Sequence, residues 1–155
     1  MGTTVMSTLP AIRRATRADA PELERLFGIL GHPIGREAIL AQWDAWMAQG
    51  NIALVADRQG GTLAGVIALC YMRVLHRARP VGRISTLVVD STVRGRGIGR
   101  SLVAAAEAIF TDAGCELVEV TSNMRRADAH AFYERLGYER TSYKFAKRIS
   151  GDRSA

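Results

Sequence analysis

A run of alternating arginines and glycines, Arg94-Gly95-Arg96-Gly97-Ile98-Gly99, is the part of the sequence best suited to chemistry. It follows an apolar stretch typical of a strand and opens an apolar-periodic stretch typical of a helix. A loop at such a junction directs backbone N–H groups into one concave site, where the helix dipole favours negative charge. Glycine allows close approach and positive φ, and arginine adds charge-assisted hydrogen bonds. The run therefore predicts a site for a compact anion such as a pyrophosphate.

The same run differs from two common nucleotide-binding patterns. It has no lysine where an ATP-binding P-loop needs one, and it is one residue short of the dinucleotide pattern G-x-G-x-x-G. A dinucleotide-binding unit also begins near the start of its domain, whereas more than half of this chain precedes the run. Two other interpretations of the run are less favoured: a loop that binds another nucleotide, and a purely structural glycine turn.

Charge and length limit the class of protein. The chain has 155 residues and a formal net charge of +6, which would suit nucleic acid, a membrane surface or a polyanionic ligand. Arg94, Arg96 and Arg100 form the densest basic group, and they alternate with glycines rather than with the aromatics of a nucleic-acid platform. The pattern favours a compact anion, and we expect no nucleic-acid partner.

Cysteine spacing and apolar runs give further expectations. Cys70 and Cys115 are isolated, without a second cysteine or a histidine at metal-ligand spacing. We expect buried, reduced thiols and no metal; a catalytic cysteine is the less favoured alternative. The first ten residues lack a signal-peptide pattern, and no apolar run reaches the ~18 residues of a membrane span. We expect a cytoplasmic protein with no membrane partner.

Hydrophobic periodicity and glycine or proline breaks predict the elements that position this run. The predicted order is βααβββαβαβ. The predicted strands cover residues 11–15, 52–56, 63–71, 84–89, 117–121 and 143–146, and the predicted helices lie near residues 20–30, 36–48, 98–110 and 128–136.

Two segments together resemble the GNAT acyltransferase superfamily. The family pattern V-x-P-x-x-R-G-x-G-x-G corresponds to residues 89–99, with Ser91 in place of the usual proline. The pattern A-x-x-x-Y-E-x-x-G-[FY] corresponds to residues 129–138. The likeness is close from Arg83 to Lys147, and before that it extends only to the order of elements.

The resemblance implies a fold and a domain organisation. The expected fold class is α/β (α+β), with a mixed, mostly antiparallel central sheet and helices on both faces. Residues 11–149 would form one acyltransferase domain, between a flexible N-terminus at residues 1–10 and a flexible C-terminus at residues 150–155. Homodimers are common in the family, so a homodimer is also open.

The resemblance further implies a site for acetyl-CoA. Its pyrophosphate would bind the loop from Arg94 to Gly99, with help from Arg100. The pantetheine arm would run along the backbone of Leu87, Val88 and Val89, in a gap between the fourth and fifth strands. Asn123 is a weaker candidate for a pantetheine contact, because Arg126 stands where many family members have an asparagine; a turn residue is its alternative. The residues expected to bind the cosubstrate are Leu87, Val88, Val89, Arg94, Gly95, Arg96, Gly97, Ile98, Gly99, Arg100 and Asn123.

Proton transfer requires two further groups. Tyr133 corresponds to the family tyrosine near the sulfur, and it is the expected general acid for a leaving thiolate of pKa ~8.5. From spacing alone Tyr133 would be a packing residue, since it lies on the apolar face of its helix. An alkylammonium of pKa ~10.4 must also lose a proton, yet residues 83–87 contain no carboxylate. Glu119 on the next strand or a water chain could accept it, and the base stays unassigned.

The resulting prediction is an acetyl-CoA-dependent N-acetyltransferase. The acceptor would be a primary amine of a small molecule or peptide, which attacks the thioester directly in a ternary complex. A non-catalytic acyl-CoA sensor is the main alternative, favoured by the missing strand carboxylate and opposed by Tyr133.

Overall fold

The computed structural model describes residues 8–150, and between Val120 and Thr121 the chain divides into two compact units. The first unit contains the sheet and three α-helices, and the second contains helix α4 (Ala127–Arg135). Most of the two ends expected to be flexible, residues 1–10 and 150–155, lies outside the described residues.

The sheet of the first unit is mixed and mostly antiparallel, as predicted. Its strands follow one another in space in chain order, and only β4 and β5 are parallel. The strands are β1 (Ala11–Arg14), β2 (Ile52–Asp57), β3 (Leu63–Met72), β4 (Val81–Val89) and β5 (Leu117–Val120). The β4–β5 crossover passes through α3 (Ile98–Asp112), the helix that follows the arginine–glycine run.

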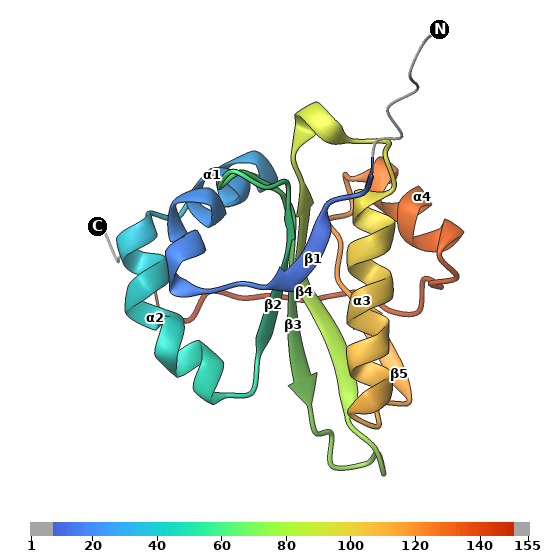
Figure 1. The fold of residues 1–155 in the computed structure, drawn as a ribbon. Helices are drawn as coiled ribbons and strands as arrows, with labels where there is room; N and C mark the ends of the chain where they lie inside the picture. Colours follow the sequence, from blue (N-terminus) through green and yellow to red (C-terminus); the bar gives the residue numbers. More distant parts are fainter. Residues whose placement is uncertain (1–7, 151–155) are drawn as a thin grey trace, which may run out of the picture. The chain divides into compact units, whose positions relative to one another are not determined.

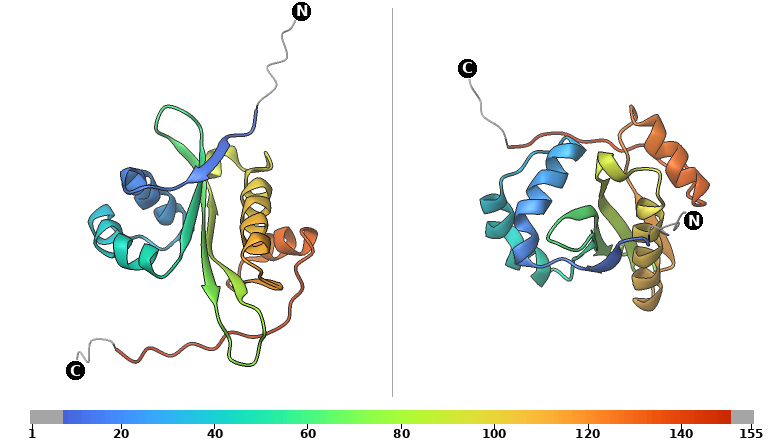
Figure 2. Two further views of the ribbon diagram at one scale, coloured as in Figure 1. Left: turned by 60° about the horizontal axis from the view of Figure 1, so that its bottom comes forward. Right: turned by 45° about the horizontal axis from the view of Figure 1, so that its top comes forward.

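Helices cover both faces of this sheet. Helices α1 (Ala20–Leu30) and α2 (Arg36–Ala48) lie on one face, and α3 lies on the other (Figures 1 and 2). Pro21 occupies the first turn of α1, and Gly31 ends the helix at φ +89°, which a residue with a Cβ adopts only with strain. The predicted fold class is confirmed.

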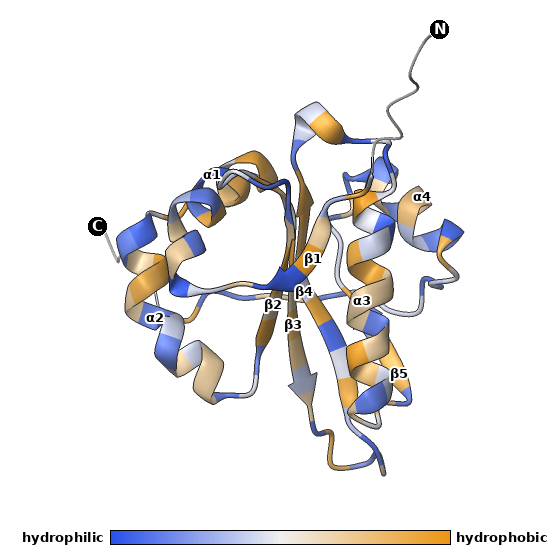
Figure 3. Ribbon diagram, in the orientation of Figure 1, coloured by the Kyte–Doolittle hydropathy of each residue, from blue (hydrophilic) through white to orange (hydrophobic). Residues whose placement is uncertain are grey.

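The apolar residues lie where the layers meet. Strands β2 and β3 are apolar over nearly their whole length, whereas the helices carry both apolar and polar residues (Figure 3). Leu23 and Leu26 of α1 are buried in one cluster, and Phe110 of α3 is buried against the opposite face. Burying each such side chain contributes roughly 1.5–3 kcal/mol. Gly82 allows α3 to approach β4, since a Cβ there would lie 2.4 Å from the Phe110 ring.

One predicted element is wrong. Residues 143–146 were expected to form a last strand, but residues 138–148 have no regular secondary structure. Tyr143 and Phe145 are 82% and 92% exposed. An alternating apolar pattern predicts a strand only if a neighbouring strand supplies hydrogen bonds and an apolar layer covers one face. Within residues 8–150 the order is therefore βααβββαβα.

None of the helices formed by residues 8–150 is long and apolar enough to cross a membrane.

Candidate functional site

Strand β4 continues beyond its partner β5. The last parallel pair joins Ile84 to Val120, while β4 runs on to Val89. Within residues 8–150, the backbone of residues 85–89 has no strand partner on this side, although β3 pairs with it on the other. Leu87 and Val89, which were predicted to bind the cosubstrate, are half-buried here, and Val88 is buried in the core below α1. Along this edge of β4 the backbone N–H and C=O groups therefore have no partner in a neighbouring strand of residues 8–150.

A β-bulge lies where the two strands separate. Ala68 pairs with Thr86 and Leu69 with Ile84, so Ser85 is the extra residue. The Ser85 hydroxyl donates to the Ala68 carbonyl oxygen at 3.2 Å. A bulge bends and twists its strand, so it turns the free part of β4 relative to the paired part.

The arginine–glycine run forms a loop held at both ends by buried residues. Val93 and Ile98 are each 4% exposed, and the residues between them are exposed. Gly95 and Gly97 have φ values of +77° and +80°. A residue with a Cβ would strain the backbone at both positions, which explains why glycine stands there.

The loop ends at the uncapped N-terminus of α3. Gly97 is the N-cap residue, and among residues 8–150 no side-chain hydrogen bond caps the first turn. The N–H groups of an uncapped first turn, among them those of Ile98, Gly99 and Arg100, have no partner inside the helix. Together with the dipole of this 15-residue helix, they form a site for an anion.

The loop and the first turn of α3 carry three cations. Arg94, Arg96 and Arg100 are exposed, and none of them forms an ion pair within residues 8–150. The Arg94 side chain makes only a long hydrogen bond, 3.4 Å, from Nε to the Val89 carbonyl oxygen. The predicted anion site therefore combines free amides with three uncompensated positive charges.

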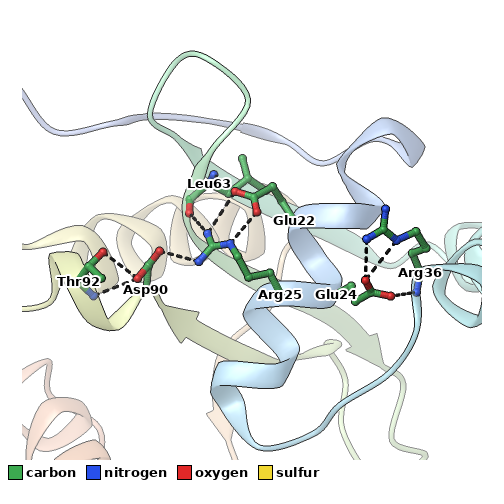
Figure 4. A network of polar contacts seen from close by, with 7 residues as sticks. All are labelled: Glu22, Glu24, Arg25, Arg36, Leu63, Asp90 and Thr92. Carbon is green, nitrogen blue, oxygen red and sulfur yellow. Dashed lines mark hydrogen bonds and ion pairs between the residues drawn. The ribbon is translucent and has the colours of Figure 1, made fainter.

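An ion-pair network that the motifs did not predict adjoins the loop (Figure 4). Asp90, the residue after β4, accepts a hydrogen bond from Arg25 of α1 at 2.7 Å. Arg25 also contacts Glu22 and the Leu63 carbonyl oxygen. Backbone and hydroxyl hydrogen bonds from Thr92 and the positive charge of Arg25 lower the pKa of Asp90 to about 2. The only sign of this network in the sequence is an acidic residue, Asp90, just before the arginine–glycine run. Its partner Arg25 is 65 residues away, so the pairing could not be predicted.

The second unit contains Tyr133 and Asn123. The Tyr133 ring makes edge-on contacts with Phe132 and Tyr138, at centroid distances of 5.2 and 5.7 Å. Burial raises the pKa of Tyr133 to about 12. Asn123 accepts a hydrogen bond from the Arg125 amide at 2.9 Å, which is the geometry of a turn residue.

Glu119, the nearest carboxylate in the sequence argument, is paired with Arg83 across the β4–β5 register. Both contacting nitrogens of Arg83 bind the same oxygen, Oε1, with Nε at 2.8 Å. Oε2 accepts no hydrogen bond from any other described residue. The Glu119 carboxylate is thus anchored through one oxygen and half-exposed. Its pair with Arg83 is the last but one between β4 and β5, next to the unpaired part of β4.

Two aromatic residues, Trp43 and Tyr71, are packing residues in this structure. Trp43 of α2 is 9% exposed and belongs to the core cluster that also contains residues of α1. The Tyr71 ring packs edge-on against Phe110 of α3, at 5.6 Å between centroids. Cys70 and Cys115 are free and half-buried, and burial raises the pKa of both thiols. These thiols stay protonated near neutral pH, which disfavours a cysteine nucleophile.

Comparison with known proteins identifies one family. The family described as "Acetyltransferase (GNAT) family" matches residues 16–138. An aminoalkylphosphonate N-acetyltransferase of Salmonella typhimurium is 33% identical over 139 residues, which cover 89% of this chain and 90% of that protein. An aminoglycoside N(6')-acetyltransferase type 1 of Stenotrophomonas maltophilia is 30% identical over 144 residues, which cover 88% and 91%.

Solved structures of acetyltransferases have the same fold as this chain. An acetyltransferase of Trypanosoma brucei superposes with a TM-score of 0.80 at 25% identity, covering 90% of this chain and 99% of that one. A glucosamine-6-phosphate N-acetyltransferase from Arabidopsis thaliana gives a TM-score of 0.78 at 21% identity, covering 90% and 98%, which supports the fold alone.

Proposed function

The chain belongs to the GNAT acetyltransferase family and transfers an acetyl group to an amine, and from this we propose that its acetyl donor is acetyl-CoA. The observation that carries this proposal is the uncapped N-terminus of α3 beside three unpaired arginines. The pyrophosphate would accept hydrogen bonds from the amides between Gly95 and Gly99, and Arg94, Arg96 and Arg100 would balance its charge.

The free edge of β4 would hold the rest of the donor. The pantetheine arm carries amides, which can pair as an additional strand would with the stretch of Leu87, Val88 and Val89, where alternate residues direct their backbone groups away from β3. Asn123 is kept only as a minor contact, because its side chain already accepts the Arg125 amide. The family match crosses both compact units, which supports residues 11–149 as one catalytic domain.

The proposed reaction is direct attack. The amine nitrogen bonds to the thioester carbon, the carbon–sulfur bond breaks, and the thiolate leaves with the electron pair. Tyr133 would donate the proton that the thiolate takes up. Because burial raises its pKa to about 12, Tyr133 is protonated at any ordinary assay pH.

We test the reaction and the acid together. Free CoA released from acetyl-CoA is measured with 2-aminoethylphosphonate, an aminoglycoside, a polyamine, amino acids and a peptide. For the acceptor that turns over, Tyr133→Phe should lower kcat about 10²-fold, the usual contribution of a general acid, and leave both KM values nearly unchanged. The matched control is Tyr71→Phe, whose ring packs on Phe110 and should leave kcat within about twofold. An unchanged kcat in Tyr133→Phe removes the assigned acid.

The acceptor class follows from charge. We propose a small primary amine that carries an acidic group, as the name of the Salmonella relative indicates for that protein. The net charge of +6 attracts such an acceptor and repels a polycationic aminoglycoside. A higher kcat/KM for the aminoglycoside than for 2-aminoethylphosphonate would reverse this assignment.

The proton of the ammonium leaves through Glu119 or through water. Free Oε2 of Glu119 can accept it, while Arg83 holds Oε1. If Glu119 is the base, Glu119→Gln should lower kcat/KM about 10²-fold at pH 7 and recover toward high pH, where the amine is already neutral. A uniform change of less than about threefold at every pH would assign the proton to water.

A further inference from the structure

Asp90 sets the geometry at the start of the donor loop. It is four residues before Arg94, and its side chain is 7% exposed. Its carboxylate accepts hydrogen bonds from the Thr92 amide at 3.0 Å and the Thr92 hydroxyl at 2.9 Å. Its own N–H donates to the Ala64 carbonyl oxygen at 2.7 Å. Asp90 therefore fixes the short turn of residues 91–93, from which the loop begins.

A carboxylate at this place also carries an electrostatic cost. Asp90 is ionised at neutral pH, since its pKa is about 2. A negative charge at the start of a loop that binds a pyrophosphate repels the ligand in a partly buried setting. The cation that opposes this charge is Arg25, whose Nη1 lies 2.7 Å from an Asp90 carboxylate oxygen.

The guanidinium of Arg25 is itself held in place from two other elements. Its Nε donates to Glu22 at 2.6 Å on α1, and Nη2 donates to the Leu63 carbonyl oxygen at 2.9 Å at the start of β3. Glu22 in turn accepts the Leu63 amide at 2.8 Å. Figure 4 shows these contacts converging on Arg25, which thus joins α1, β3 and the end of β4.

We propose that Arg25 and Asp90 are positioning residues for the donor site. Their ion pair holds the loop from Arg94 to Gly99 in the conformation that accepts the pyrophosphate, and Arg25 offsets the charge of Asp90. The proposal rests on the proposed function, because it assigns these residues to acetyl-CoA binding. Neither side chain need touch the donor.

The chain contains a matched control for the test. Arg13 on β1 also binds two carboxylates, Asp19 at 2.8 and 2.9 Å and Asp57 at 2.8 Å. Its side chain is 40% exposed, against 36% for Arg25. These contacts join β1, β2 and the turn before α1, and none involves residues 90–100. Arg13→Gln should therefore reproduce the loss of stability without the loss of donor binding.

The experiment compares R25Q, R13Q, D90N and the double variant R25Q/D90N. CoA affinity is measured by calorimetry and Tm by thermal unfolding. R25Q should weaken CoA binding about tenfold, and R13Q less than about twofold at a similar fall in Tm. The double variant should bind CoA more tightly than R25Q, because the uncompensated carboxylate is gone. KM for acetyl-CoA should rise in R25Q, while KM for the acceptor stays within about twofold.

Two outcomes overturn the proposal: equal changes in CoA affinity for R25Q and R13Q, or no recovery in the double variant. If R25Q does not fold, R25K replaces it. Lysine keeps the positive charge but lacks the planar fork of arginine, so the CoA affinity of R25K should lie between those of the wild type and D90N. Wild-type CoA affinity in D90N would overturn the proposal. A wild-type protein that fails to bind CoA would instead defeat the proposed function.

Discussion

At the residue scale, Asp90 makes stability depend on pH. Its pKa is lowered from 3.8 to about 2 in the folded chain. The carboxylate therefore stabilises the fold above its unfolded pKa, and this contribution is lost as pH falls from about 4 to about 2. The shift corresponds to about 2 kcal/mol in the free energy of unfolding.

We expect Asp90→Asn to flatten the acid limb of stability. The free energy of unfolding, measured in urea between pH 5 and pH 2, should fall by about 2 kcal/mol less than in the wild type. Asp44→Asn is the control, because Asp44 is 87% exposed and its pair with Arg17 contributes little. Parallel curves for the wild type and Asp90→Asn would show that the contacts of the Asp90 carboxylate with Thr92 and Arg25 do not stabilise the fold.

At the element scale, the donor site depends on how a strand passes into a helix. Gly97 has φ +80° and open space around a built Cβ, so an added methyl costs backbone strain without a steric clash. In the proposed donor site its N–H and those of the next residues would bind the pyrophosphate, and a changed φ would reorient them.

Gly97→Ala should therefore lose both stability and donor affinity. Gly61→Ala is its control, since Gly61 has φ +87° and open space, but lies in the turn between β2 and β3. Both should lose about 1–2 kcal/mol of unfolding free energy. Only Gly97→Ala should raise the Kd for CoA, by about tenfold in calorimetry. A similar Kd in the two variants would exclude the loop as the pyrophosphate site.

At the scale of the whole molecule, charge should govern how the donor arrives. The net charge is +6, and the three arginines beside α3 are not paired with carboxylates of residues 8–150. Salt screens such charges, with a Debye length of about 10 Å at 0.1 M and about 3 Å at 1 M.

We expect KM for acetyl-CoA to rise several-fold between about 0.05 and 0.5 M sodium chloride, while kcat changes little. Initial rates at fixed acceptor measure both constants, and S-acetylpantetheine, which lacks the phosphates, is the control donor. Its KM should be nearly independent of salt. Equal salt effects on the two donors would mean that phosphate recognition does not depend on these arginines.

Local sequence was sufficient to predict most of the helices and strands and the family. Helices, the strands of the sheet and the arginine–glycine loop follow from hydrophobic period, proline and glycine, because each of these acts over a few residues. The bounds of α2, residues 36–48, agree with the prediction. The acetyltransferase prediction, made from two spaced motifs, is confirmed by the family match. The roles of Tyr133 and of the loop residues stay predictions.

Contacts between residues far apart in the sequence could be found only in the folded chain. The length by which β4 exceeds β5 depends on strand pairing, and the Arg25–Asp90 pair joins residues 65 apart. Residues 143–146 were predicted to form a strand, yet strand pairing depends on a neighbour that the local sequence does not specify. Contacts between distant segments depend on packing of the whole chain, which local periodicity does not encode.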